Sequence, residues 1–470
     1  MNNANDKNNL SGPTRLDGSS QDDTQAILQK VTVAHQQALS LLQQTEMAYG
    51  RLIPRQLLTL LEKDSIVDVK LGDQVERKLT IMFSDIRNFT TLSESMTPGE
   101  NFEFLNSYLS QMEPVIGKHR GIIDKYMGDA IMALFPHGAD DALSGAIAML
   151  EKLSSYNAGR SRAGYIPTHI GIGLNTGMVM IGTVGGANRM DSTVIGDPVN
   201  LTSRIEEATK TYHVPLLISQ NALYDLADPV KYNIRFLDRI RVKGKTQPLS
   251  VYEVFDNDHA DLRNSKRTSK PEFEEAIAYY HLKEIPRSIE LLNHCLRIAP
   301  KDIPAHIYMA RCEDYLATGQ HLSTDELNNA LEWRAEFLIG IESIDKSHKK
   351  LFDTINAFTS IGNNRNSNAF QELFSFLASY AQASLKTEKD LMRRYNYPFL
   401  DSHLQEHKRF IENFTALQKE AETNTGDQLY LSFRTQLLLF DWFTGHVAKA
   451  DRHMGRHLIH AIQPPASHSA

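Results

Sequence analysis

The chain lacks several features that would place it outside the cell or in a membrane. It has 470 residues but only two cysteines, Cys295 and Cys312, too few for a disulfide framework and typical of a reducing compartment. No run of about 18 apolar residues could cross a membrane, and the polar N-terminus lacks the apolar core of a secretory signal. Basic residues are not in excess, since the net charge is -7. We therefore expect a cytoplasmic protein without a nucleic-acid partner.

Changes in composition divide the chain into six segments. We predict a disordered tail at 1–24, a helical dimerisation segment at 25–64, an α+β domain at 65–256, a linker with tetratricopeptide-like helices at 257–329, an all-α bundle at 330–460 and a second disordered tail at 461–470. Apolar residues from Ile27 to Leu52 recur every 3.5 residues, as in a coiled coil. A helix packed on the next domain is the alternative. The tetratricopeptide-like helices are too few to be stable alone, so we expect them to pack on a neighbour.

Residues 65–256 alternate short apolar runs with helical patterns in the order β-α-β-β-α-β, which predicts a ferredoxin-like α+β fold with a mixed or antiparallel sheet. Asp85 ends the first predicted strand, and Asp129 lies at the tip of a predicted hairpin. Two carboxylates at adjacent strand ends can hold Mg2+. Asn200 and Arg204 share a helix face, where an amide and a guanidinium can orient a nucleotide and neutralise a phosphate. Each fragment by itself is more often structural.

Taken together, "FSDIRNFT", "DKYMGDAIMALF", "TVIGDPVNLTSR" and "VKGKTQPLSVYEV" resemble the blocks of class III nucleotide cyclases. The resemblance implies a cyclic nucleotide and pyrophosphate as products, and a site shared between the two chains of a homodimer. It also implies the following roles: two Mg2+ or Mn2+ on Asp85 and Asp129 with the Ile86 carbonyl, purine contacts from Lys125 and Thr193, ribose orientation by Asn200, α-phosphate stabilisation by Arg204, and triphosphate binding by Lys243.

The purine contacts favour ATP as the substrate. A lysine ammonium can donate to adenine N1, and a threonine hydroxyl can accept from the adenine amine. Guanine presents the opposite pattern, and cyclases for GTP typically carry glutamate where this chain has Lys125. A guanylate cyclase is the alternative, and an inactive dimeric scaffold is disfavoured because the implied catalytic residues are all present. Some members of the subclass with threonine at position 193 respond to bicarbonate.

The C-terminal part reads as four amphipathic helices near 345–361, 368–393, 400–422 and 428–459, which predicts an antiparallel bundle. Candidate metal ligands occur on all four helices: His348 on the first, Glu388 on the second, His403 and His407 on the third, and His446 and Asp451 on the fourth. Imidazoles and carboxylates inside a bundle are a typical way to hold two irons. The nearby histidines His453, His457 and His460 are further candidate ligands, but we expect them at the surface.

This ligand order resembles the hemerythrin family over about residues 333–460. The resemblance implies one iron on His403, His407 and His446, a second on His348, and bridging by Glu388 and Asp451. Ser384 stands where the family has a histidine of the second iron, so we expect that iron to bind more weakly. Three interpretations stay open: non-haem di-iron that senses O2, NO, redox state or iron supply, a mono-iron or zinc site on the three histidines, and a metal-free bundle.

The sequence as a whole predicts a homodimeric adenylate cyclase that converts ATP to 3′,5′-cyclic AMP under control of a hemerythrin-like domain. We expect the helical connector between the two domains to transmit the state of the bundle. The alternative is a protein that binds iron or oxygen, with the cyclase domain secondary.

Overall fold

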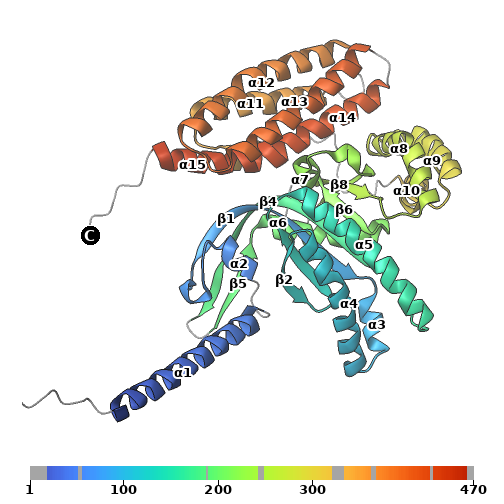
Figure 1. Ribbon diagram of the computed structural model, residues 1–470. Helices are drawn as coiled ribbons and strands as arrows, with labels where there is room; N and C mark the ends of the chain where they lie inside the picture. The colour runs from blue at the N-terminus through green and yellow to red at the C-terminus, as the bar shows by residue number, and fades with distance from the viewer. Residues whose placement is uncertain are drawn as a thin grey trace, which may run out of the picture. The chain divides into compact units, whose positions relative to one another are not determined.

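The computed structural model describes residues 18–50, 55–186, 189–241, 248–319, 333–360, 367–423 and 427–462 (Figure 1). The chain divides into two compact units, Met1–Ile66 and Val67–Ala470. The first contains helices α1 (Gly18–Gly50) and α2 (Arg55–Leu60). Because α1 begins at Gly18, the prediction of a disordered tail through residue 24 is wrong at its end.

Helix α1 exposes the apolar residues that its sequence spaces like a coiled coil. Ile27, Val31 and Leu41 are each at least 60% exposed in the single chain. Leu52, at the end of the predicted seam, lies outside the described residues. Pairing of this seam with a second chain stays a prediction.

The second unit contains an α+β domain built on an eight-stranded sheet, as the sequence predicts. Its strands are β1 (Gln74–Ile86), β2 (Ile122–Met127), β3 (Ala130–Phe135), β4 (Ile170–Gly186), β5 (Arg189–Ile195), β6 (Leu216–Ser219), β7 (Ile234–Arg241) and β8 (Pro248–Val254). They run in the order β2-β3-β1-β4-β6-β8-β7, with β5 paired to β4. The sheet is mixed, because β4 and β6 are parallel while the other pairs are antiparallel.

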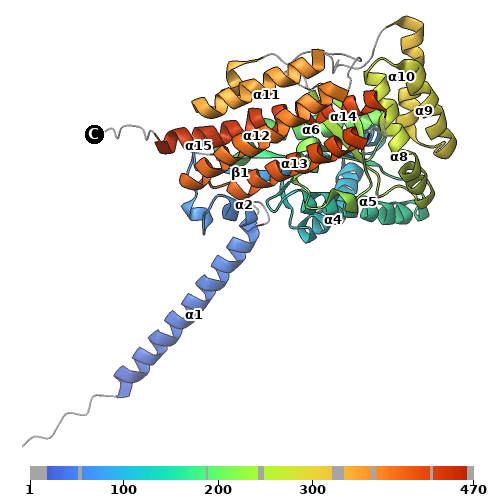
Figure 2. The same cartoon turned by 90° about the horizontal axis from the view of Figure 1, so that it is seen from above.

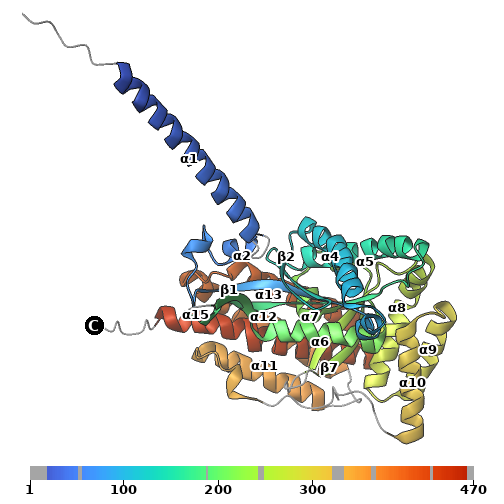
Figure 3. The same cartoon turned by 90° about the horizontal axis from the view of Figure 1, so that it is seen from below.

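Helices cover both faces of this sheet. They are α3 (Phe89–Glu94), α4 (Pro98–Lys118), α5 (Ala139–Arg162), α6 (Asp197–Tyr212) and α7 (Gln220–Asp225). Because side chains alternate along a strand, Leu216 and Ile218 join the core beneath α4 and α5, which lie together in Figures 1 and 3, whereas Leu217 joins the core beneath α6. Helix α6 approaches β4 closely, since a Cβ atom on Gly173 would lie 2.4 Å from the backbone nitrogen of Glu206.

The segment after the sheet is helical where its polar sequence predicts a linker. Helix α8 (Ala260–His281) begins inside the polar stretch 256–270, and α9 (Ile285–Ile298) and α10 (Ile303–Thr318) follow. The linker prediction is wrong there because Lys266 is buried, with its ammonium 2.7 Å from both the Glu253 and the Asp258 carboxylates. These ion pairs hold the polar helix against the last strand of the sheet.

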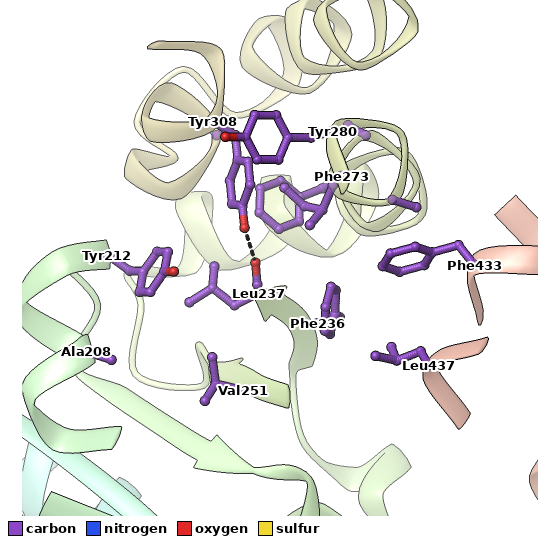
Figure 4. Close-up of a cluster of buried hydrophobic side chains, with 14 of the residues drawn as sticks. Ala208, Tyr212, Phe236, Leu237, Val251, Phe273, Tyr280, Tyr308, Phe433 and Leu437 are labelled. Carbon is purple, nitrogen blue, oxygen red and sulfur yellow. Dashed lines mark hydrogen bonds between the residues drawn. The ribbon is translucent and has the colours of Figure 1, made fainter. Parts of the chain in front are cut away.

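The three connector helices share one hydrophobic core with the sheet and with the C-terminal bundle (Figure 4). Phe236 of β7 packs edge-to-face against Phe433 of the bundle, with ring centroids 5.9 Å apart. The Tyr308 hydroxyl donates to the Leu237 carbonyl oxygen at 2.9 Å. Cys295 and Cys312 are free and buried in the same core. The connector thus packs on neighbouring parts of the chain, as its small number of helices predicts.

The C-terminal helices form the predicted bundle and lie alongside one another in Figures 1 and 2. They are α11 (Glu342–Ser360), α12 (Ser367–Arg394), α13 (Leu400–Thr423), α14 (Gln428–Asp441), the π-helical segment η5 (Trp442–Asp451) and α15 (Arg452–Ile462). In the fourth helix of the bundle the π-helical turns fall on the predicted ligands His446 and Asp451; such turns are frequent at functional sites. Within the described residues, no helix combines the length and apolar character needed to cross a membrane.

Candidate functional site

The sheet brings Asp85 and Asp129 together. Asp85 precedes the last residue of β1, and Asp129 lies in the turn between β2 and β3, next to the strand that pairs with β1. The Ile86 backbone N–H donates to Asp129 Oδ2 at 3.2 Å. Burial, and after it the neighbouring Asp85, raise the pKa of Asp129 to about 7. Two crowded carboxylates that resist joint ionisation suit a divalent cation, which would relieve their repulsion.

A lysine with no predicted role contacts Asp85 of this pair. Lys210, near the end of α6, places its ammonium 2.7 Å from Asp85 Oδ2. This contact shows that Asp85 attracts positive charge in the folded chain. Lys210 lies six residues after Arg204 on the same helix, so only the packing of α6 against β1 reveals it.

Lys125 and Thr193, predicted to read a purine, lie side by side. Lys125 projects from β2, and its ammonium donates to the Thr193 hydroxyl of β5 at 3.3 Å. The same ammonium lies 3.3 Å from the buried Asp124 carboxylate. Sixty-eight residues of sequence separate the pair, so their contact depends on strand pairing that no local pattern specifies.

Asn200 and Arg204 lie on α6 with exposed side chains. The Arg204 guanidinium pairs with Glu207 at 2.8 Å, a contact that water screens and a phosphate could replace. Lys243, predicted to bind the triphosphate, lies outside the described residues. Among the residues described, no hydrogen bond or ion pair connects the two aspartates with Lys125, Thr193, Asn200 or Arg204 within one chain.

A second constellation lies inside the bundle, where all six predicted iron ligands converge. Donor atoms of five of them lie within 4.8 Å of one another: Glu388, His403, His407, His446 and Asp451. The sixth, His348, places Nε2 3.2 Å from Asp451 Oδ2. All six side chains are buried. The spacing of five between His446 and Asp451 suits the π-helical segment, in which residues five apart face one another.

The two carboxylates divide their oxygens between two groups of histidines. Glu388 Oε2 lies 3.2 Å from His407 Nε2, and Asp451 Oδ1 lies 3.1 Å from His403 Nε2 and 3.2 Å from His446 Nε2. The other oxygens, Glu388 Oε1 and Asp451 Oδ2, lie 3.8 and 3.2 Å from His348 Nε2. The site therefore has a first position with three imidazoles and a second position with one, bridged by both carboxylates.

Iron can fit this site only if the donor atoms are free to bind a metal ion. His348 Nε2, His403 Nε2, Glu388 Oε2 and both Asp451 oxygens are buried and, among the described residues, make no hydrogen bond. Imidazoles and carboxylates are ligands that iron accepts. Nearby carboxylates raise the pKa of His348 to about 9 and of His446 to about 10, despite the opposing effect of burial. The site thus attracts positive charge, and its residues fit one metal ion at each position.

Ser384 stands at the point on α12 where the hemerythrin family has a histidine ligand of the second position. Its hydroxyl donates to Glu388 Oε1 at 3.4 Å, so it faces the site from the turn before Glu388. A hydroxyl is a weaker iron ligand than an imidazole. The chain therefore offers the second position one imidazole, two bridging oxygens and a neighbouring serine.

Two functional candidates near the bundle escaped the sequence analysis. Glu406, inside the "HLQEH" motif, accepts from His446 Nδ1 at 2.7 Å and so turns His446 Nε2 toward the site. Its other oxygen lies 3.0 Å from the ammonium of Lys78 on β1. The spacing of His403 and His407 does not indicate a role for the glutamate between them. Its partner Lys78 lies 328 residues away in the sequence.

His453 is not at the surface, contrary to the sequence-based expectation. It is buried, its Nδ1 lies 2.6 Å from the Tyr397 hydroxyl, and its Nε2 lies 2.8 Å from Glu76 of β1. The expectation is wrong because the sheet covers this part of the bundle, which the sequence of α15 does not reveal. His453 and Glu406 therefore both contact the first half of β1.

Comparison with known families gives a match for each of the two parts of the chain that contain these constellations. Residues 72–254 match the adenylate and guanylate cyclase catalytic domain, and residues 339–458 match the hemerythrin HHE cation-binding domain. The chain thus contains one domain of each family.

Individual relatives of known sequence or structure match mainly the first of these domains. An adenylate cyclase of Anabaena cylindrica is 41% identical over 231 residues, which is 48% of this chain and 46% of that protein. The terminal-differentiation-specific adenylate cyclase of Dictyostelium discoideum is 35% identical over 60% of this chain and 13% of its own length. The adenylyl cyclase CyaB from P. aeruginosa, a solved structure, is 35% identical over 39% of this chain and 96% of that one, with a TM-score of 0.35. The chain spans less than half of either curated relative.

Proposed function

We propose that this chain, with its cyclase catalytic domain and its hemerythrin domain, is an adenylate cyclase that forms 3′,5′-cyclic AMP and pyrophosphate from ATP under control of a metal site in its bundle. The observation that carries the proposal is the juxtaposition of Asp85 and Asp129 inside the matched cyclase domain. The matched relatives include adenylate cyclases, which supports the same activity here.

Each catalytic residue has a role that its position supports. Asp85 and Asp129 hold two divalent cations, with the Ile86 carbonyl as a further ligand. Bound Mg2+ or Mn2+ would activate the ribose 3′-hydroxyl and neutralise the triphosphate. Asn200 orients the ribose and Arg204 stabilises charge on the α-phosphate, both from the exposed face of α6. Lys243, which lies outside the described residues, is assigned to the terminal phosphates by the family resemblance alone.

The contact between Lys125 and Thr193 supports adenine as the base. The ammonium can donate to adenine N1 while the hydroxyl accepts from the exocyclic amine, so both side chains serve one base edge. GTP would present a donor N1 to the ammonium, and two donors facing each other repel. We therefore propose selectivity for ATP over GTP.

Two copies of the chain are needed for each site. Among the described residues of one chain, no hydrogen bond or ion pair joins the aspartates to Lys125, Thr193, Asn200 or Arg204, which supports a site completed across a homodimer interface. The exposed apolar positions of α1 support pairing of the same two chains.

Mixing two inactive variants tests this arrangement. Asp129→Ala removes the metal half of each site, and Asn200→Ala removes the other half. Random exchange of equal amounts should restore about a quarter of the wild-type rate, because half of the dimers then hold one intact site. Failure of the mixture to regain activity, with exchange shown by tagged chains, would refute the shared site.

In the bundle, we propose that His403, His407 and His446 hold one iron, that His348 holds a weaker second one, and that Glu388 and Asp451 bridge them. Bound non-haem iron would supply a redox-active centre with room for O2 or NO at the second position. His446 is fixed by Glu406, and the charges of the carboxylates attract the metal. The redox state, the gas or the metal supply is the proposed input.

The output passes directly from the bundle to the catalytic strand, which differs from the expected route through the connector. Lys78 of β1 contacts Ser402 and Glu406 of α13 at 2.6 and 3.0 Å. Strand β1 continues from Lys78 to Asp85 without interruption. A cavity of about 720 Å³ between the sheet and the bundle is lined by Lys78, Glu406, His403 and His446. Any shift of α13 upon metal binding would therefore act on the strand that carries Asp85.

Product formation by the purified chain from ATP and from GTP tests the activity. We expect cyclic AMP from ATP with Mg2+ or Mn2+, little cyclic GMP, and no product from Asp129→Ala. An iron-containing protein without cyclase activity would support the alternative, in which the bundle binds iron or oxygen and the cyclase domain is secondary.

A further inference from the structure

A tyrosine lies one helical turn before Ser384 on the same face of α12. Tyr380, Ser384 and Glu388 are spaced by four residues, so their side chains follow one another along the helix. Tyr380 is 5% exposed and Ser384 is also 5% exposed, so this face of α12 points into the bundle. The face carries the ligand Glu388 at one end and the phenol at the other.

The Tyr380 hydroxyl is buried without a hydrogen-bond partner among the described residues. The indole Nε1 of Trp442, at the start of the π-helical segment, is buried and unpartnered as well. Buried polar groups are rarely left unpaired unless an ion, a water molecule or a ligand completes them. The unpartnered phenol, one turn before Ser384 on the face of α12 that carries Glu388, therefore points to a ligand there.

Tyr380 packs in the same hydrophobic cluster as Trp442, whose ring stacks on the candidate ligand His446 with centroids 3.9 Å apart. Burial, and after it the carboxylates of Glu388 and Asp451, raise the pKa of Tyr380 well above its usual range, whereas the side chains of Trp442 and Ser384 lower it. An indole N–H and a serine hydroxyl in this part of the bundle would favour negative charge on the phenol oxygen.

We propose that Tyr380 takes the place of the missing histidine and binds iron at the second position through its phenol oxygen. The inference rests on the proposed iron site. Tyrosine is an established protein ligand of iron, and its side chain is longer than that of serine, which suits a start one turn farther away. On coordination the O–H bond is replaced by an oxygen–iron bond, and one proton leaves to solvent.

A phenolate ligand has chemical consequences that an imidazole lacks. The anionic oxygen adds negative charge to a position that already has two shared carboxylate oxygens, so it favours ferric over ferrous iron there. We therefore expect the second position to respond to redox state and not to bind oxygen reversibly.

Optical spectroscopy of the full chain tests the proposal. Purified metal-free protein is titrated with ferric ammonium citrate, bound iron is counted, and the visible and resonance Raman spectra are recorded. We expect a phenolate-to-iron charge-transfer band with enhanced tyrosine ring vibrations. Tyr380→Phe should abolish this band, weaken the second iron by about tenfold or more, and leave the first iron bound.

Two further variants separate ligation from a packing role. Tyr397→Phe is the matched control, because Tyr397 is also buried in the bundle but its hydroxyl already bonds His453 at 2.6 Å; its band should be unchanged. Ser384→His restores an imidazole to the second position and should reduce the band while both irons stay bound. This variant also tests the proposal should Tyr380→Phe fail to fold.

The possible failures are distinguishable. Binding of ferric iron without a phenolate band, or a band that survives in Tyr380→Phe, would overturn this inference while leaving the proposed iron site intact. A chain that takes up no iron at all would overturn both. Cyclase activity is not part of the readout.

Discussion

The ammonium of Lys78 lies 3.0 Å from Glu406, whose second oxygen lies 2.7 Å from His446 Nδ1. One carboxylate thus connects a strand of the cyclase domain with a ligand of the candidate iron site. Asp225, 3.1 Å from Lys78, adds a second negative partner from the sheet side. The two carboxylates raise the pKa of Lys78 although burial opposes them, so the lysine stays charged.

Breaking this link should uncouple the bundle from the sheet. Lys78→Met leaves Glu406 and Asp225 without their cation, which we expect to cost about 3 kcal/mol of stability and to change iron affinity through His446. Lys349→Met is the control, because Lys349 is half-exposed and its ion pair with Asp353 lies within one helix of the bundle. Unfolding by urea and competitive iron titration measure the two effects. Iron affinity equal to wild type in Lys78→Met would contradict the link.

Magnesium binding by the catalytic aspartates should depend on pH near neutrality. The pKa of Asp129 is raised to about 7, and only the ionised carboxylate binds a cation well. A falling pH therefore protonates Asp129 and weakens Mg2+ binding below about pH 7, whereas an aspartate with an ordinary pKa of about 3.9 would show no change there. The Mg2+ concentration for half-maximal rate, measured at about pH 6, 7 and 8, checks this. A constant value would be evidence against the coupled pair.

Reversal of the purine contact should change base selectivity. Lys125→Glu, combined with a change at Thr193 such as Thr193→Ser that keeps a hydroxyl donor, presents guanine with an acceptor for N1 and a donor for O6. We expect the ratio of kcat/KM for GTP over ATP to rise by about tenfold or more. Lys118→Glu, an exposed lysine on α4, is the matched control. Unchanged selectivity would show that Lys125 does not contact the base.

Loss of a ligand at the first metal position should have the largest effect on metal content. His446→Ala removes one of three imidazoles and also frees Glu406, so we expect the first iron to be lost from purified protein. His460→Ala, an exposed histidine on α15, should retain full metal content. Elemental analysis of the two variants compares them directly. Equal iron in both would exclude the three-histidine site.

Much of the fold could be predicted from the sequence because its signals are local. The apolar run ending in Asp85, the hairpin around Asp129 and the four amphipathic helices of the bundle all occur close to where they were expected. The polar segment at the start of α8 was misread as a linker, since its helix depends on Lys266 and its buried partners Glu253 and Asp258. Such long-range ion pairs leave no local pattern.

The candidate sites, too, could be predicted from the sequence only in part. The six candidate ligands of the bundle could be named from their resemblance to the hemerythrin ligand order, but the division of the carboxylate oxygens between two positions could be seen only in the packed helices. Glu406 and Tyr380 lie within or beside the motifs yet look like ordinary helix residues. Their importance depends on Lys78 and Trp442, which approach from other parts of the chain.

The most direct test of the central claim is the rate of cyclic AMP formation from ATP by the full chain before and after iron removal. The same preparation, depleted with a chelator and then restored with iron, should show rates that differ by about fivefold or more, in the range typical of allosteric coupling. In the Lys78→Met variant, the rates of the iron-bound and iron-free protein should differ less. Equal rates in the two metal states, with iron shown to be bound in one and absent in the other, would contradict control of the cyclase by its bundle.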